Sequence, residues 1–264
     1  MNININQNPN QAIKLSVTAG EILLANGAET YRVEDTMRRM LTCCGYHNSE
    51  VFAVSTGIFA SVIAEAGPVT TVKRIPRRSI NVDILIRMND ISRSFAEGRL
   101  SAEGALEKME ELRSGRLTHS HPFLKLFAAG IACGSFAFLF GGSLADCLNA
   151  FFTGIILQIF LFQLGKIRVP DVLRNILGGA MISFLVLIFM NIGLGREPDY
   201  AIIGSLMLLV PGLALTNAVR DVFEGDYISG SARLLDAVTT AVCLATGVGV
   251  TLSLWFHLFG GPYI

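Results

Sequence analysis

The chain has 264 residues, of which 52% are apolar and 16% charged, and its 21 basic residues balance its 21 acidic ones. A neutral chain gives no electrostatic basis for binding nucleic acid, and the five cysteines lack the spacing of a zinc site. Charge is concentrated at the N-terminal end, since residues 1–122 hold 14 of the Lys and Arg and 13 of the Asp and Glu. We therefore expect a cytoplasmic α+β domain over residues 1–118 and a membrane domain over residues 119–264.

The expected soluble domain contains both helical and strand patterns. Apolar residues recur at helical spacing in four segments, which are 11–25, 30–44, 81–97 and 101–112. Asn26-Gly27 is a typical helix stop, because Gly tolerates the left-handed cap conformation. Runs rich in β-branched and aromatic residues predict a small antiparallel sheet from Glu50–Ser55, Ile58–Ala64 and Val69–Ile75.

Polar and charged residues follow the predicted helix stop. Glu29, Thr30, Arg32 and Glu34 form a candidate binding site of the cytoplasmic domain, although a solvated helix start would have the same composition. The domain has no phosphate-binding loop, no nucleophile elbow and no histidines at metal spacing. We therefore predict that the protein is not an enzyme and has neither a cofactor nor a metal.

Five apolar runs in the second part approach the roughly 20 residues that a helix needs to cross a bilayer. They are 123–140, 144–164, 172–192, 201–217 and 235–256. We expect five transmembrane helices. An intramembrane aspartyl protease would need aspartates inside two facing helices, whereas Asp146 and Asp171 are expected at loop ends.

Lys and Arg mark the cytoplasmic ends of membrane helices and so predict the orientation. The domain and the loops on one side contain Lys73, Arg74, Arg77, Arg78, Lys166, Arg168, Arg174, Arg220 and Arg233. The alternate loops contain only Arg196. We expect the N-terminus in the cytoplasm and the C-terminus outside.

The segment between the fourth and fifth runs has an unusual composition for a membrane protein. The fourth run is interrupted at Pro211-Gly212, and the polar and charged residues that follow include Asn217, Arg220, Asp221, Asp226 and Arg233. A charge at the centre of a bilayer costs roughly 2.5–3.5 kcal/mol, so such groups are normally at the boundary, paired, or turned toward a wet cavity. This segment is the first candidate for a functional site.

Four segments resemble the bacterial threonine/serine exporter (ThrE/YjjP) family. They are N-G-A-E-T-Y-R-V-E (Asn26–Glu34), S-T-G-I-F-A-S-V (Ser55–Val62), R-S-I-N-V (Arg78–Val82) and P-G-L-A-L-T-N-A-V-R-D-V-F-E-G-D-Y-I-S-G-S-A-R (Pro211–Arg233). The resemblance implies a multi-pass protein of the bacterial inner membrane that belongs to a secondary exporter of threonine and serine or of a dicarboxylate such as succinate. It further implies that this chain is the YjjP-like half, which needs a second five-span, YjjB-like subunit.

The resemblance gives the charged segment possible roles. Arg220 would hold a substrate carboxylate through forked hydrogen bonds, and Asn217 would contact a hydroxyl or amino group. Asp221 or Asp226 would carry the coupling proton. Alternatively, Arg220, Asp221, Asp226 and Arg233 neutralise one another and shape the inner loop. A different function also stays open, namely a membrane-anchored sensor or scaffold whose cytoplasmic domain binds a ligand or partner.

Overall fold

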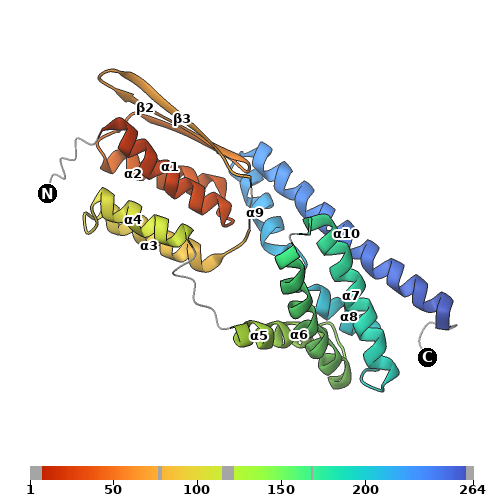
Figure 1. Ribbon diagram of the computed structural model, residues 1–264. Helices are drawn as coiled ribbons and strands as arrows, with labels where there is room; N and C mark the ends of the chain where they lie inside the picture. The colour runs from red at the N-terminus through yellow and green to blue at the C-terminus, as the bar shows by residue number, and fades with distance from the viewer. Residues whose placement is uncertain (1–7, 77–78, 115–121, 168, 260–264) are drawn as a thin grey trace. The chain divides into compact units, whose positions relative to one another are not determined.

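A computed structural model describes residues 8–76, 79–114, 122–167 and 169–259 (Figure 1). The predictions for Arg77, Arg78 and Arg168, and the expected domain boundary at 118/119, lie outside these ranges. The chain forms two compact units. The first contains Met1–His119 together with Leu213–Leu235, and the second contains Ser120–Gly212 together with Asp236–Ile264.

The first unit is an α+β domain in which four helices pack with one small sheet. The helices are α1 (Pro9–Ala25), α2 (Thr30–Cys43), α3 (Val82–Ala96) and α4 (Ala102–Arg113). The antiparallel sheet has the order β1-β2-β3, from β1 (Ser49–Val54), β2 (Gly57–Ala64) and β3 (Gly67–Arg74). The helices and strands predicted in this part of the sequence are confirmed, with ends that differ by at most two residues.

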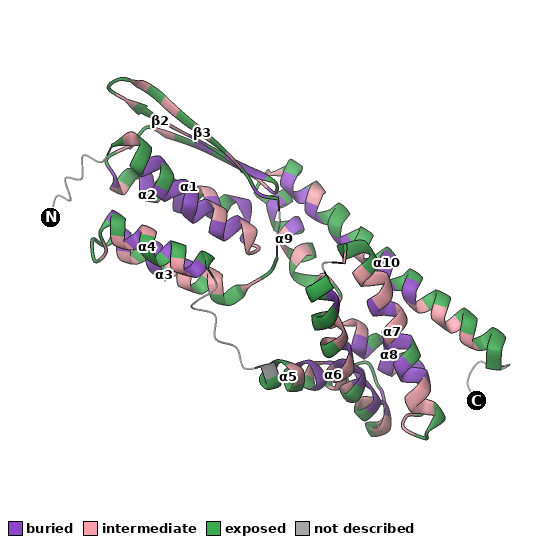
Figure 2. Ribbon diagram, in the orientation of Figure 1, coloured by how far each residue is buried: buried purple, intermediate pink, exposed green. Residues whose placement is uncertain are grey.

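The core of the first unit surrounds α1, which lies between the sheet and the α3–α4 pair (Figure 1). Asn8 caps this helix by accepting a hydrogen bond from the Asn10 N–H, and Pro9 occupies its first turn. Leu15 and Leu24 are fully buried. Figure 2 shows α1 as one of the most continuously buried helices of the domain. Burial on most of its surface makes α1 the support for the loop that follows it.

Two further elements complete the first unit, although they are distant in the sequence. Helix α9 (Gly212–Phe223) and the first turns of α10 (Tyr227–Phe259) form a tight hairpin, and residues 213–235 of this hairpin pack with the domain. Gly230 allows the two helices to approach closely, because a Cβ there would lie 2.5 Å from Cγ2 of Val222. The hairpin includes most of the charged segment.

The second unit is helical and apolar. It contains α5 (Pro122–Leu139), α6 (Leu144–Ile167), α7 (Asp171–Asn191), α8 (Pro198–Leu206) and the remainder of α10. Within the described residues, three helices are long and apolar enough to cross a membrane, namely α6, α7 and α10. Phe123–Leu139 in α5 is a shorter apolar helix. Many large apolar side chains of this unit are exposed, as along α10 in Figure 2.

The fourth apolar run is not one helix, which differs from the expected continuous span. Helix α8 ends at Leu206, five residues before Pro211, and α9 begins at Gly212. Proline lacks the N–H of a helical hydrogen bond and disfavours helical geometry at the residue before it. The residues between the helices instead make short turns, in which the Leu209 N–H donates to the Leu206 carbonyl. The break expected at Pro211-Gly212 is present, but the helix ends earlier than predicted.

Small residues allow the helices of the second unit to pack closely. A Cβ on Gly204 of α8 would lie 2.6 Å from the backbone N of Ala137 in α5. A Cβ on Gly247 of α10 would lie 2.1 Å from the carbonyl O of Ile176 in α7. These distances are shorter than any ordinary contact, so the two crossings require glycine, as in membrane helix pairs generally.

Candidate functional site

The loop between α1 and α2 supplies one side of the candidate site. Gly27 has a φ of 92°, which reverses the chain after α1, and the Ala28 N–H bonds back to the Leu23 carbonyl. Helix α2 starts at Thr30, after Glu29, whose side chain makes no capping bond to the helix. The carbonyls of Gly27 and Ala28 and the N–H of Thr30 are therefore left available to partners from another element.

The α9–α10 hairpin supplies the other side. Asp226 precedes α10 and caps it, because its Oδ1 accepts a hydrogen bond from the Ser229 N–H at 3.2 Å. The Asp226 N–H donates to the Asp221 carbonyl at 2.8 Å, and Gly225 between them has a φ of 88°. This turn brings Arg233 of α10 beside Asp221 of α9.

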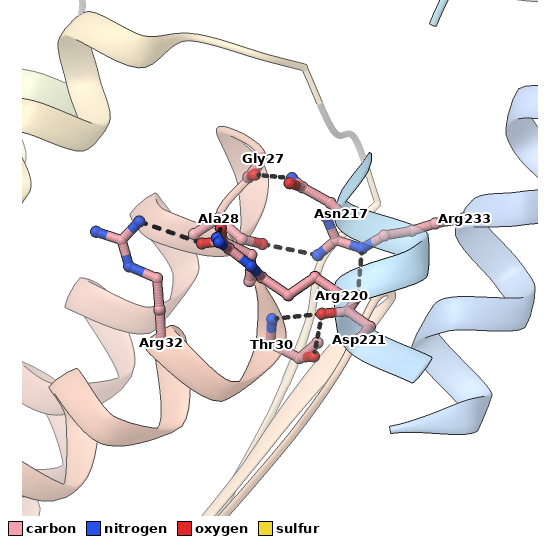
Figure 3. A network of polar contacts seen from close by, with 9 residues as sticks. Gly27, Ala28, Thr30, Arg32, Asn217, Arg220, Asp221 and Arg233 are labelled. Carbon is pink, nitrogen blue, oxygen red and sulfur yellow. Dashed lines mark hydrogen bonds and ion pairs between the residues drawn. The ribbon is translucent and has the colours of Figure 1, made fainter. Parts of the chain in front are cut away.

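Asp221 contacts both sides of the site, namely Thr30 of the loop and Arg233 of the hairpin (Figure 3). It is fully buried, and its Oδ1 accepts bonds from the Thr30 hydroxyl at 2.9 Å and the Thr30 N–H at 3.3 Å. Its Oδ2 lies 3.0 Å from Nε of Arg233 in an ion pair. Asp221 thus caps the N-terminus of α2 from 191 residues away, at the end of the helix dipole that favours a negative charge.

The loop carbonyls receive the remaining donors of the hairpin. Arg233 Nη2 donates to the Ala28 carbonyl at 2.7 Å, and Asn217 Nδ2 donates to the Gly27 carbonyl at 2.9 Å (Figure 3). Two carbonyls, one N–H and one hydroxyl of the 27–30 loop are therefore bonded to the hairpin. The buried Arg233 and Asp221 each have polar contacts that offset their removal from water.

A second ion-pair group joins the same two segments at the surface. The Glu29 carboxylate lies between two guanidinium groups, with Oε1 2.5 Å from Nη1 of Arg220 and Oε2 3.2 Å from Nη1 of Arg32. The Glu29 side chain is 9% exposed, whereas those of Arg220 and Arg32 are 53% and 47% exposed. The carboxylate is therefore covered, while both arginines still reach solvent.

A third connection involves the sheet. The Ser55 N–H donates to Oγ of Ser229 in α10 at 3.1 Å. Glu34 on α2 accepts a bond from the Ala53 N–H at 2.8 Å, which ties α2 to β1. Within the described residues, no group of three His, Cys, Asp or Glu side chains is placed to hold a metal ion.

The carboxyl groups of this region differ in their pKa. Burial would raise the pKa of Glu29, but a backbone hydrogen bond, the Arg220 hydrogen bond and the charges of Arg32 and Arg220 together hold it below its ordinary value. Burial raises the pKa of Asp221, and the Arg233 charge and the Thr30 donors oppose that rise without cancelling it. Burial also raises the pKa of Glu34.

The structure brings together most of the residues singled out in the sequence. Asn217, Arg220, Asp221 and Arg233 all contact the loop that contains Glu29 and Thr30, so two motifs considered separately form one network. Arg220 pairs with Glu29 and not with Asp221, whereas Asp221 pairs with Arg233. Asp221 and Arg233 thus form one ion pair of the kind that mutual neutralisation would require. The remaining candidates have other positions. Asp226 lies in the hairpin turn, Glu34 contacts β1, and Pro211-Gly212 lie at the helix break.

The sequence reasoning missed a second polar cluster, which lies in the second unit. Asp146 is buried in the first turn of α6, where its carboxylate accepts bonds from the N–H and hydroxyl of Ser143 and from the N–H groups of Arg196 and Glu197. One turn later, Asn149 donates to the carbonyls at 186 and 194. The S-x-x-D spacing of Ser143 and Asp146 is a helix-start signature that would have predicted the first of these contacts.

Comparison with known proteins places the chain in a family. A family model described as "Putative threonine/serine exporter" matches residues 14–255. A "Probable threonine/serine exporter" of Mycobacterium tuberculosis is 24% identical over 92% of this chain and 46% of its own length. A "Threonine/serine exporter" of Corynebacterium glutamicum is 24% identical over 93% of this chain and 52% of its own length. The chain thus spans about half the length of these two relatives.

A shorter relative matches over nearly its whole length. The "Probable succinate transporter subunit YjjP" of Escherichia coli K12 is 25% identical over 91% of this chain and 93% of its own length. No solved structure matches the chain. The family model covers both halves of the polar network and the apolar helices, and the chain is a membrane protein that belongs to the threonine/serine exporter family.

Proposed function

We propose that this protein is a subunit of a secondary transporter that exports small polar carboxylates, either threonine and serine or a dicarboxylate such as succinate. Family membership supports transport, and the names of the relatives supply substrates that all contain a carboxylate. The observation that carries the proposal is the position of Arg220. Its half-exposed guanidinium group follows a break in an apolar run, where a substrate carboxylate can accept forked hydrogen bonds.

We further propose five membrane crossings, of which the fourth is discontinuous. Helix α8 has 9 residues and is therefore about 14 Å long, less than half of a hydrocarbon core of about 30 Å. Completing that crossing requires the turn at 207–211 and part of α9. Secondary transporters commonly use broken helices of this kind, because the freed backbone groups line a cavity. Pro211 and Gly212 produce the break in this account.

The proposed orientation has the N-terminus in the cytoplasm and the C-terminus outside the bacterial inner membrane. The loop charges support it. After five crossings the chain ends on the opposite side of the membrane from where it began. A second five-span unit that starts there would have the inverted orientation, which is a common arrangement of paired transporter halves. The word "subunit" in the names of the YjjP relatives supports a partner of this type.

Within the candidate site, we assign different tasks to the exposed and the buried residues. Arg220 receives the substrate, and Asp226 or Asp221 is the candidate for the coupling proton. Asn217 and Arg233 hold the hairpin on the 27–30 loop, since their amide and guanidinium groups already donate to loop carbonyls. A transporter of this type needs no cofactor and catalyses no chemical reaction.

Export measurements test the proposal. The chain is produced with a five-span partner in cells that lack their own exporter, and efflux of threonine, serine and succinate is measured at matched membrane abundance. Arg220→Lys keeps the charge but loses the planar fork, so we expect export to fall about tenfold or more. Arg174→Lys, in an exposed pair with Asp171, is the matched control. Unchanged export by Arg220→Lys would remove Arg220 from the site, and robust export by the chain alone would remove the need for a partner.

A membrane-anchored sensor is the second candidate, because the cytoplasmic loop satisfies most of the polar groups of the hairpin. In that case ligand binding would persist in purified protein while efflux of all three solutes stayed at the level of cells without the protein. Efflux above that level excludes this alternative.

A further inference from the structure

Glu29 places a carboxylate between two guanidinium groups that come from different parts of the chain. Arg32 is on α2 and Arg220 is on α9, and each contacts a different oxygen of Glu29. A single carboxylate thus bridges two guanidinium groups, each through one Nη1, and arginine is a side chain that commonly recognises carboxylates.

The burial of the three groups differs in a way that a purely structural ion pair does not require. The Glu29 side chain is almost completely covered, but about half of each arginine side chain is exposed. Ion pairs whose groups stay in contact with water contribute less to stability than fully buried ones, and both cationic partners of Glu29 are half exposed. A competing anion can therefore approach both arginines from solvent, and the loss of the Glu29 contacts would not unfold the domain.

The surroundings of the loop favour such an exchange. Glu29 makes no side-chain capping bond to α2, because the Asp221 carboxylate takes that position. Glu29 can therefore leave the arginines while the α2 cap stays in place. Tyr31 and Glu224 are the other groups that interact electrostatically with Arg220. When Glu29 has left, the two positive charges of Arg32 and Arg220 outweigh the single negative charge of Glu224, which lies one turn after Arg220.

We propose that Arg32 and Arg220 form a carboxylate-binding site in which Glu29 is a resident counter-ion that the incoming carboxylate of a small solute displaces. The ligand class is a small aliphatic carboxylate, one carboxylate group of which contacts both arginines as Glu29 does. This assignment rests on the proposed function, since it gives Arg220 a partner in holding the substrate. It also makes Glu29 a competitor that sets the affinity of the site.

The exchange has a consequence for the hairpin. While Glu29 bridges the arginines, it links α9 to the 27–30 loop. Once a ligand takes its place, that surface link is lost, while the buried contacts of Asp221 and Arg233 persist. Ligand binding then removes the solvent-exposed link between α9 and the 27–30 loop and leaves the buried links intact.

Equilibrium binding of labelled succinate and threonine to the purified full-length chain tests the site. Glu29→Gln removes the competing charge at nearly constant size, so we expect the Kd for succinate to fall about tenfold. Adding Arg32→Ala or Arg220→Ala should abolish that gain. Asp83→Asn, which removes a carboxylate from an exposed pair with Arg87 on α3, should leave the Kd unchanged. Glu29→Asp, with a shorter side chain that cannot bridge both arginines, should give an intermediate affinity.

The outcomes separate this inference from the proposed function. A Kd that changes less than twofold in both Glu29 variants, or a gain that survives the loss of either arginine, would overturn the site. Succinamide, which has a similar shape without charge, should not bind. If it bound as tightly as succinate, the carboxylate-binding site would likewise be overturned. Export by the unmodified chain with its partner is measured separately, so a failure of export would refute the transporter without deciding the binding result.

Discussion

Removing the Asp221 carboxylate should open the α2 end of the first unit, because this group both caps a helix and neutralises a buried arginine. Loss of the cap costs about 1 kcal/mol. Removing one partner of a buried ion pair costs about 3–5 kcal/mol, and the Arg233 side chain is mostly covered. The two effects share one side chain and do not add fully, so we expect Asp221→Ala to destabilise the unit by about 3–5 kcal/mol.

A single buried thiol provides the assay. Cys44 follows α2 and is 2% exposed, and burial raises the pKa of its thiol to about 11. It therefore reacts with a maleimide only when the first unit opens around α2 and exposes the end of that helix. In a full-length chain with the other cysteines replaced, the labelling rate reports the opening equilibrium. Since about 1.4 kcal/mol corresponds to a factor of ten, Asp221→Ala should increase the rate by roughly a hundredfold or more.

Three further variants make the explanation specific. Asp221→Asn keeps an acceptor for Thr30 but loses the charge, so its rate should be intermediate. Asp221→Ala with Arg233→Met leaves no buried charge unpaired and should label more slowly than Asp221→Ala alone. Asp35→Ala removes an exposed carboxylate of α2 that pairs with Arg39, and it should change the rate little. Equal labelling rates for Asp221→Ala and the unmodified chain would refute the cap and the buried pair together.

Three other perturbations test separate features. Gly230→Ala would place a Cβ 2.5 Å from Cγ2 of Val222, so it should destabilise the α9–α10 hairpin by about 1–3 kcal/mol. Cys44 should then be labelled faster, and an unchanged rate would show that the two helices do not need glycine at this position. Burial raises the pKa of Glu34 above 4.5, so its ionised form opposes folding. Stability should increase as the pH falls through the raised pKa toward 4.5, and Glu34→Gln should remove that part of the pH dependence of thermal unfolding. The proposed orientation predicts that an impermeant maleimide labels Ser143→Cys from outside intact cells and Gly225→Cys only after the inner face is exposed; the reverse pattern would invert the topology.

Local patterns predicted the elements of the first unit well. The Asn26-Gly27 stop, the β-branched runs and the helical spacing each act over a few residues, so the sequence alone is sufficient to identify them. The fourth apolar run was less predictable, because hydropathy measures length and composition but not where a helix ends before a proline. Helix α8 stops five residues before Pro211, and the turns between them leave no signal in an apolar sequence.

The candidate site was predictable in its residues but not in its pairings. The charged segment stood out because charges are rare near membrane-length apolar runs. Its partners are mainly backbone groups, such as the carbonyls of Gly27 and Ala28, and every sequence supplies these at every position. The contact between Asp221 and Thr30 joins residues 191 positions apart, and only the folded chain shows which of several acidic residues takes that place.

The first unit consists of two segments that are far apart in the sequence, and this determines when it can form during synthesis. Its last segment, Leu213–Leu235, is separated from Met1–His119 by residues 120–212. At about 5–20 residues per second, the ribosome needs roughly 5–20 s to pass from one segment to the other. During this interval Thr30 and the carbonyls of Gly27 and Ala28 lack the hairpin groups that bond to them in the finished protein. The domain at the beginning of the chain is therefore completed only after most of the membrane helices have been made, and a ribosome that stalls before the hairpin leaves it without the cap on α2.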